Sequence, residues 1–190
     1  MTAPVRFAAR VRFAASLVVA VALSACGVVR VEGQPDPAAI PAGPLEAVGA
    51  EATGPIVEIG SGRTLGVGWR YATYESADGI CTQLELASYT TAGCGPLPLV
   101  AEGSVFGRAG SGGTGEPDAP VPYDGIVSRD VAEVWLVTDS GQRLATTLMS
   151  LAEAGHDATA FVGFAPPEEA VTGAVAVDAD GRVIETFNLD

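Results

Sequence analysis

The stretches VGWRYATY (residues 67–74) and ICTQLEL (residues 80–86) decide the fold class of this chain. In both, larger apolar or aromatic side chains recur at every second position, and small or polar residues lie between most of them. Successive side chains of a strand point to opposite faces, so a period of two predicts half-buried β-strands. Strand patterns also appear at residues 131–138, 142–149, 158–164, 171–177 and 182–188, and residues 97–106 form another mainly apolar stretch.

Turn signals separate these stretches at the spacing expected of a sandwich or barrel. DSG (residues 139–141) and DADG (residues 178–181) each favour a tight turn between strands. About nine short strands are expected in residues 55–190. We therefore predict an all-β protein, a single antiparallel β-sandwich of immunoglobulin-like character. At most a turn of helix is expected, near residues 150–154 or 168–170.

Residues 108–120 are rich in glycine, serine, proline and acids, which predicts a flexible loop within the sandwich. Part of this loop, GSGGTG (residues 110–115), matches the Gly-x-Gly-x-x-Gly pattern of dinucleotide-binding turns. That pattern needs a strand before it and a helix after it, whereas EPDAP follows it here. We expect neither a nucleotide site nor any other cofactor.

The N-terminal segment has three arginines among its first 12 residues, followed by an apolar run over residues 13–23 that is interrupted only by Ser16. A membrane-spanning helix needs about 20 apolar residues, so this shorter run is typical of the core of a signal peptide. The sequence LSAC (residues 23–26) comes next. An ordinary secretory signal cleaved elsewhere and an uncleaved anchor are the alternatives.

The order of positive head, short apolar core, small residues and Cys26 resembles the lipobox of bacterial lipoprotein precursors. The resemblance implies a signal peptide over residues 1–25, cleavage before Cys26, and lipid attached to that cysteine. Two or more acyl chains give stable anchoring to a membrane. The later strands and the Asp-Gly hairpin also loosely resemble small β-sandwich domains of exported proteins of high-GC Gram-positive bacteria, a likeness that implies no activity.

Residues 26–54 contain prolines at positions 35, 37, 41 and 44 among alanines and glycines, without apolar periodicity. This composition predicts a lipidated, extended tether between the membrane and the sandwich. The domain boundaries expected from the sequence are therefore residues 1–25, 26–54 and 55–190.

If Cys26 carries lipid, two cysteines remain, Cys81 and Cys94. An extracytoplasmic location permits a disulfide between them. A redox pair or a metal pair is the alternative, but the spacing fits neither Cys-x-x-Cys nor a four-ligand zinc site. Cys81 is on the opposite strand face from Leu84, so the disulfide is expected at the exterior or edge of the sheet.

Acidic residues dominate the charge of the chain. Loss of residues 1–25 removes three of the ten basic residues and no acid, which leaves seven against 23 and a formal charge of −16. Phosphate backbones repel such a surface, so nucleic acid is excluded as a partner. Cations or basic partners would be attracted, although surface acids more often serve solubility.

Candidate catalytic and metal-binding residues do not form a recognised pattern. His156 is the only histidine, and no serine lies in a Gly-x-Ser-x-Gly motif, so a solvated loop histidine is the better interpretation. Asp178 and Asp180 precede Gly181, but the EF-hand register fails, which favours a hairpin turn. A looser oxygen site would have to draw on Glu116, Asp118, Asp124, Asp130, Glu168 and Glu169.

Four aromatic residues, Trp69, Tyr71, Tyr74 and Trp135, are candidates for a binding platform. Aromatic residues on alternating strands more often pack in the core. Tyr74 has the opposite phase from Trp69 and Tyr71, so it is the member expected to be exposed.

Together these observations predict a lipoprotein on the outer side of the cell membrane that acts as a non-catalytic binding or assembly module of the envelope. Its expected partners are the membrane, through Cys26, and an envelope protein or ligand. The alternatives are a carboxylate-based hydrolase of envelope glycans, which needs two suitably spaced carboxyl groups, and an ion- or small-ligand-binding lipoprotein.

Overall fold

The computed structural model describes residues 36–95, 105–112 and 118–189. The chain divides into two units, residues 1–34 and 35–190, and all of the described residues belong to the second unit. The predicted signal peptide, the lipid-attachment residue Cys26 and the first part of the predicted tether lie outside the described residues. Within the described part, no helix has the length and hydrophobicity needed to span a membrane.

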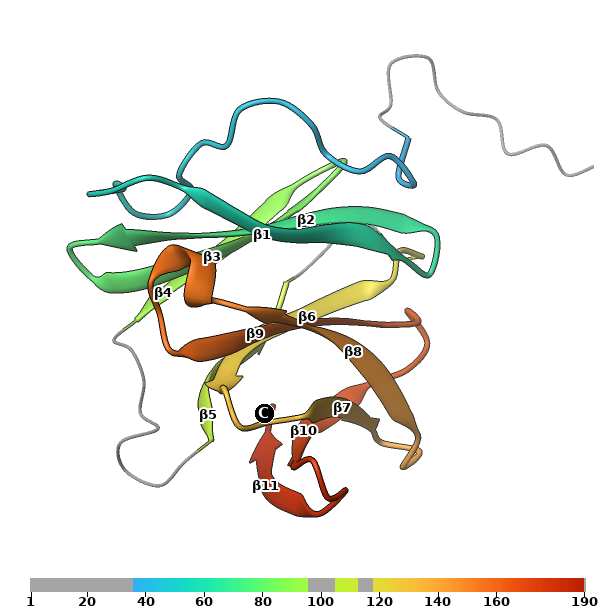
Figure 1. The fold of residues 1–190 in the computed structure, drawn as a ribbon. Coiled ribbons are helices and arrows are strands. Elements are labelled where there is room, and N and C mark those ends of the chain that lie inside the picture. The colour runs from blue at the N-terminus through green and yellow to red at the C-terminus, as the bar shows by residue number, and fades with distance from the viewer. Residues whose placement is uncertain (1–35, 96–104, 113–117, 190) are drawn as a thin grey trace, which may run out of the picture. The chain divides into compact units, whose positions relative to one another are not determined.

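The first sheet is an antiparallel meander of four consecutive strands (Figure 1). These are β1 (Val57–Thr64), β2 (Val67–Ser76), β3 (Gly79–Leu86) and β4 (Thr90–Gly95). β2 and β3 are the two stretches in which the sequence alternates most regularly, and they form the centre of this sheet. β1 and β4 are its edges.

The second sheet has seven antiparallel strands in the order β11-β10-β7-β8-β9-β6-β5. A single 3₁₀ turn, Ala152–Ala154, connects β8 to β9. The strands are β5 (Phe106–Ser111), β6 (Val121–Ser128), β7 (Glu133–Thr138), β8 (Arg143–Ser150), β9 (Ala158–Ala165), β10 (Val171–Val177) and β11 (Val183–Asn188).

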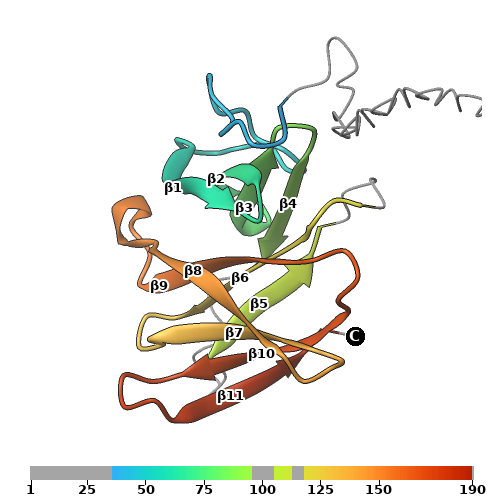
Figure 2. The same cartoon turned by 90° about the vertical axis from the view of Figure 1, so that its right-hand side faces the viewer.

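A first hydrophobic core fills the space between the two sheets. Trp69 and Tyr71 of β2 and Leu84 of β3 meet Ile126 of β6 and Val162 of β9 in this core. The same phase of β2 that the sequence marks as apolar therefore faces the second sheet. Figures 1 and 2 show the first sheet lying above one end of the second.

A second core lies on the other face of the second sheet, which curls around it. Phe161 of β9, Leu136 of β7 and Val127 of β6 are fully or almost fully buried there. The curl brings the edge strands β5 and β11 together, because Phe106 contacts Phe187 with ring centroids 5.4 Å apart. β9 contributes to both cores, which explains why almost all of its residues are buried.

The predicted all-β class and antiparallel sheets are confirmed, in an arrangement between a sandwich and a barrel. The strand order differs from that of immunoglobulin domains, in which each sheet combines strands from different parts of the chain. Here the first four strands form one sheet and the later seven form the other. The expected turns at residues 139–141 and 178–181 join β7 to β8 and β10 to β11.

The prediction of a flexible loop over residues 108–120 is wrong for its first part. Residues 108–111 belong to β5 and pair with β6, and the Gly112 N–H donates to the Pro122 carbonyl over 3.0 Å. The segment has few of the side chains that favour strands. It is a strand because its backbone pairs with β6. Residues 113–117 lie outside the described part of the chain.

The prediction of an extended tether is wrong for residues 36–53, which we call the strap. The strap runs across the outer face of the first sheet, the face that points away from the core, as both views show (Figures 1 and 2). A β-bridge joins Ala52 to Ser76, and the Thr53 N–H donates to the Glu75 carbonyl over 2.8 Å. The strap has the proline- and alanine-rich composition of a linker, but its backbone is hydrogen-bonded to the first sheet.

Candidate functional site

Besides the Thr53 N–H, the strap is bound to the first sheet through the carbonyl groups of its own backbone. Three side chains on the outer face of β2 and β3 donate to these carbonyls, and one backbone N–H of β2 adds a fourth bond. The pairs are Gly68 N to Pro37 O (2.8 Å), Arg70 Nη1 to Gly43 O (2.9 Å), Gln83 Nε2 to Glu46 O (3.1 Å) and Tyr74 Oη to Val48 O (2.5 Å). No strap side chain takes part in these four bonds.

Arg70 is the centre of a charged cluster beneath the strap. Only 6% of its surface is exposed, and both Nε and Nη2 donate to Glu85 Oε2, the former over 2.9 Å. Glu58 Oε2 lies 3.9 Å from Arg70 Nη1. Removing a guanidinium and a carboxylate from water costs several kcal/mol each, so their mutual contact and the Gly43 carbonyl offset a substantial penalty.

Gln83 extends this cluster along β3. Its Nε2 donates to Glu85 Oε1 over 3.0 Å as well as to the strap, so both oxygens of Glu85 accept hydrogen bonds. Its Oε1 is buried and makes no hydrogen bond within the described residues. A buried side-chain acceptor without a protein partner is uncommon in folded proteins.

A cavity of about 520 Å³ lies between the strap and the sheet beside this cluster. The strap side contributes Ile40, Pro44 and Glu46, and the sheet side contributes Arg70 and Glu85. Its volume is within the range of small-ligand sites, and it combines apolar walls with charged groups. The pocket is open to solvent on one side, and its volume and mixed lining make it a candidate small-ligand site.

Glu46 and Glu85 are the two acidic residues that line this cavity, which bears on the glycan-hydrolase alternative. A glycosidase needs one carboxyl group able to donate a proton and a second able to attack or activate water. Both oxygens of Glu85 accept hydrogen bonds from Arg70 or Gln83. The arrangement therefore suits an electrostatic role for Glu85, in which it holds Arg70 in position.

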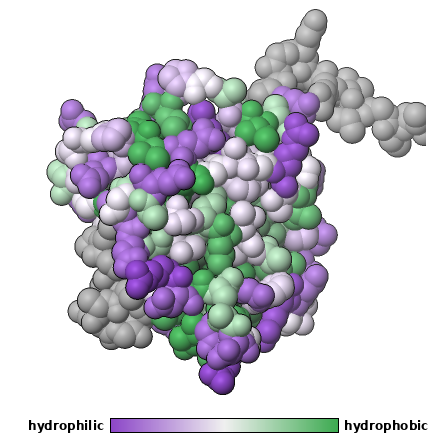
Figure 3. Space-filling model, viewed as in Figure 1, coloured by the Kyte–Doolittle hydropathy of each residue, from purple (hydrophilic) through white to green (hydrophobic). Residues whose placement is uncertain are grey.

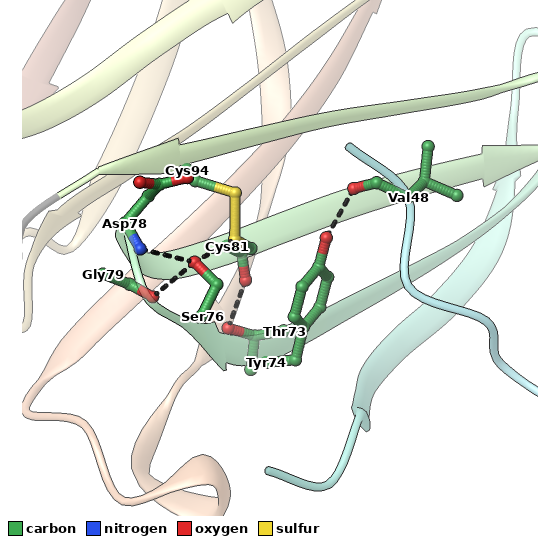
Figure 4. The surroundings of a disulfide bond; sticks show 8 residues. All are labelled: Val48, Thr73, Tyr74, Ser76, Asp78, Gly79, Cys81 and Cys94. Atoms are coloured by element: carbon green, nitrogen blue, oxygen red, sulfur yellow. Dashed lines mark hydrogen bonds between the residues drawn. A yellow bond between two sulfur atoms is a disulfide. The ribbon is translucent and has the colours of Figure 1, made fainter. Parts of the chain in front are cut away.

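The predicted disulfide is present, and it lies on the same outer face as the strap (Figure 4). Cys81 and Cys94 are directly opposite each other on β3 and β4, with Cα atoms 4.0 Å apart. β4 is an edge strand, so the disulfide attaches an edge to the centre of the sheet. Figure 4 also shows Tyr74, on the neighbouring strand, reaching the Val48 carbonyl.

The aromatic residues do not form a common platform. Trp69 and Tyr71 are buried between the sheets, as the core-packing interpretation predicts, and Trp135 lies on β7 of the second sheet. The expectation that Tyr74 is exposed is wrong, because only 2% of its surface is accessible. Its side chain does lie on the outer face that its phase predicts, but the strap covers that face.

The remaining candidate residues are dispersed. His156 lies in the loop before β9 and is half-buried. Asp178 Oδ1 accepts from the N–H groups of Asp180 and Arg182, each over 2.9 Å, and so forms the predicted hairpin turn. No group of three or more metal-ligating side chains occurs within the described residues.

The acids proposed for a loose oxygen site have separate surroundings. Asp124 accepts from the Tyr71 hydroxyl over 2.8 Å, Asp130 lies 3.6 Å from Arg129, and Glu169 accepts from Ser140. Glu116 lies outside the described residues.

Sequence reasoning missed the cluster of Arg70, Gln83 and Glu85. The available signal was the presence of three long polar side chains in one phase of β2 and β3, next to Tyr74. Such a pattern ordinarily indicates the solvent-exposed face of an antiparallel sheet whose other face packs on the core. Comparison with known proteins finds no matching family model, no similar curated protein and no similar solved structure.

Proposed function

We propose that this protein is a lipid-anchored, extracytoplasmic module that binds or assembles with other envelope components and does not catalyse a reaction. The single observation that carries the proposal is the pairing of Cys81 with Cys94. Structural disulfides persist in oxidising compartments outside the cytoplasm. With two of the three cysteines paired, Cys26 remains for the lipid that its sequence context implies.

The strap changes how such a module would operate. Asp36, the first described residue of the strap, is ten positions after Cys26. An extended chain spans at most about 3.3–3.6 Å per residue, so this link reaches no further than about 35 Å. A free tether up to residue 54 would have allowed about 100 Å. The proposed partners are therefore components close to the membrane surface.

Metabolic labelling with a fatty acid, followed by fractionation of the cells, tests the anchor. The wild-type protein is expected to carry acyl label and to sediment with membranes, whereas Cys26→Ser loses both properties. Ser24→Ala is the matched control, since it changes a small neighbour and retains the cysteine. An unlabelled wild-type protein found only in the external medium would contradict the proposal.

In-cell cross-linking of the same strains tests the binding role. A stoichiometric protein partner that is captured with the wild type, and is lost when residues 36–190 are deleted behind an intact anchor, supports an interaction module. A membrane-bound protein that captures no partner would transfer support to the small-ligand or hydrolase alternatives.

A further inference from the structure

The hairpin between β1 and β2 presents a leucine in an unfavourable conformation. Leu65 has φ +49°, and 54% of its surface is exposed. It is the only non-glycine residue with a positive φ among the described residues. Asparagine, aspartate and glycine adopt this left-handed conformation more readily than a bulky side chain does. Thr64 pairs with Val67, so residues 65 and 66 form a two-residue hairpin turn that requires a positive φ at both positions. Leucine is therefore poorly suited to this turn both in conformation and in exposure.

Several apolar residues line one groove together with Leu65. A groove of about 330 Å³ is lined by Leu65, Val67, Pro37 and Pro120. Ile40, 40% exposed, follows on the strap. We call Pro37, Ile40, Leu65, Val67 and Pro120 the hairpin end. Figure 3 shows hydrophobic residues at two places along the top of the molecule, where the strap runs.

Charged residues are scarce at the hairpin end. Residues 37–45, 64–68 and 119–122 contain no charged side chain, although the chain has 23 acids. The exceptions at its border are Asp36, Arg63 and Asp118. The Asp36 carboxylate accepts from the Ala38 N–H over 3.1 Å, and Asp118 lines the groove. Ile40 and Leu65 are exposed within these uncharged segments, and an uncharged apolar surface favours a partly apolar partner.

The strap begins at this same end of the domain. The Pro37 carbonyl accepts from the N–H of Gly68, three residues after Leu65. Cys26 precedes Asp36 by ten residues, so the start of the strap lies within about 35 Å of the cysteine along any path of the chain. Among the exposed apolar side chains, Ile40 and Leu65 therefore lie near the point where this short link enters the domain, whereas Val183 and Ile184 belong to β11.

We propose that the hairpin end contacts the lipid surface on which the protein is anchored, with Leu65 inserted among the lipid headgroups. This inference rests on the proposed lipid anchor. Arg63 can extend its apolar stem along the same surface and leave its guanidinium in the polar layer. The acidity of the chain favours a surface rich in zwitterionic lipid.

The β10–β11 hairpin supplies a matched control. Val183, the first residue of β11, has the same exposed fraction as Leu65, 54%. The β10–β11 hairpin and the first sheet lie at opposite ends of the domain in both views (Figures 1 and 2). Val183 has no positive φ. It belongs to the last strand of the chain, so all the other strands lie between it and Cys26 in the sequence. If exposure alone decided lipid contact, labels at positions 65 and 183 would be quenched equally by lipid. The proposed contact predicts quenching at position 65 only.

The test uses the full lipidated protein reconstituted in phosphatidylcholine vesicles. Leu65→Cys and Val183→Cys each provide one free thiol for an environment-sensitive nitrobenzoxadiazole label, because the other cysteines are acylated or paired. At position 65 the label is expected to shift its emission to the blue and to be quenched by spin-labelled phospholipid. At position 183 it is expected to remain unquenched with the emission of a water-exposed label.

Flotation of the vesicles separates the two proposals. Vesicle-bound protein with both labels unquenched, or with both quenched equally, overturns the lipid contact while the anchor stands. Protein that does not float with the vesicles overturns the anchor, and with it the inference.

A second variant separates lipid contact from folding. Leu65→Asn suits the left-handed turn, so the thermal midpoint is expected to stay the same or rise. A label at Ile40→Cys should nevertheless lose part of its lipid quenching when Leu65→Asn is added. Unchanged quenching in the double variant would contradict the role of Leu65.

Discussion

Arg70 shows how one buried charge holds two parts of the chain together. Its side chain is 8% exposed and that of Glu85 is 13% exposed, so the pair is screened little by water. Arg70 also donates to the Gly43 carbonyl of the strap. Loss of the arginine leaves a buried carboxylate without its main partner and removes one attachment of the strap.

Arg70→Ala is therefore expected to lower the free energy of unfolding by about 3–5 kcal/mol. Denaturant unfolding of the wild type and the variant measures this difference. Arg129→Ala is the control, because its ion pair with Asp157 is exposed and its removal should produce no resolvable change. Equal effects of the two substitutions would contradict a buried position for Arg70.

The strap is the element whose attachment depends most on a single close approach. A Cβ atom added at Gly68 would lie 2.3 Å from the Ala39 carbonyl oxygen and 2.4 Å from its carbon. Both are backbone atoms, so no side-chain rotation can relieve the clash. Glycine is required at this position by the strap above it.

Gly68→Ala is expected to displace the start of the strap and to cost about 1 kcal/mol for the lost bond to Pro37, together with the packing around it. Hydrogen–deuterium exchange should show faster exchange at the neighbours of Gly68 and in residues 36–53. Gly54→Ala is the matched control, since its Cβ would meet no atom within 4 Å. Unchanged exchange of the strap in Gly68→Ala would show that the strap is not seated on β2.

At the scale of the whole domain, Glu185 joins the two ends of the curled sheet. Its Oε2 atom accepts from the N–H groups of Val105, over 2.5 Å, and Phe106, over 3.2 Å. β5 and β11 are the edge strands of the second sheet. The Glu185 carboxylate therefore accepts the two backbone N–H bonds that the carbonyls of a neighbouring strand would otherwise accept. The Phe106–Phe187 contact covers the same seam.

Glu185→Ala is expected to lower the free energy of unfolding by about 1–3 kcal/mol, because two backbone donors lose their acceptor. Glu185→Gln keeps an acceptor oxygen and should retain most of the stability. Thermal unfolding compares the three proteins, and exchange at Phe106 reports on the seam itself. If the alanine and glutamine variants are equally stable, the seam does not depend on this acceptor.

The sequence by itself determined most of the strands, the two hairpin turns and the disulfide. These features depend on local rules: the period of two in β2 and β3, the Asp-Gly turn after β10, and the small number of cysteines. It also contains the lipobox resemblance at Cys26, which stays a prediction. β4 (TTAGCG) has no alternation and is a strand because β3 pairs with it and the disulfide joins them.

Only the tertiary structure decided what covers the outer face of the first sheet and how the second sheet closes. The strap is held through backbone groups, mostly carbonyls, which every residue has. Its proline-rich sequence therefore gives no sign of the contact. Arg70 and Tyr74 therefore lie at positions that the sequence pattern assigns to an exposed face, but they are as buried as core residues. The seam likewise joins residues about 80 positions apart, and a local pattern carries no information about a partner at that separation.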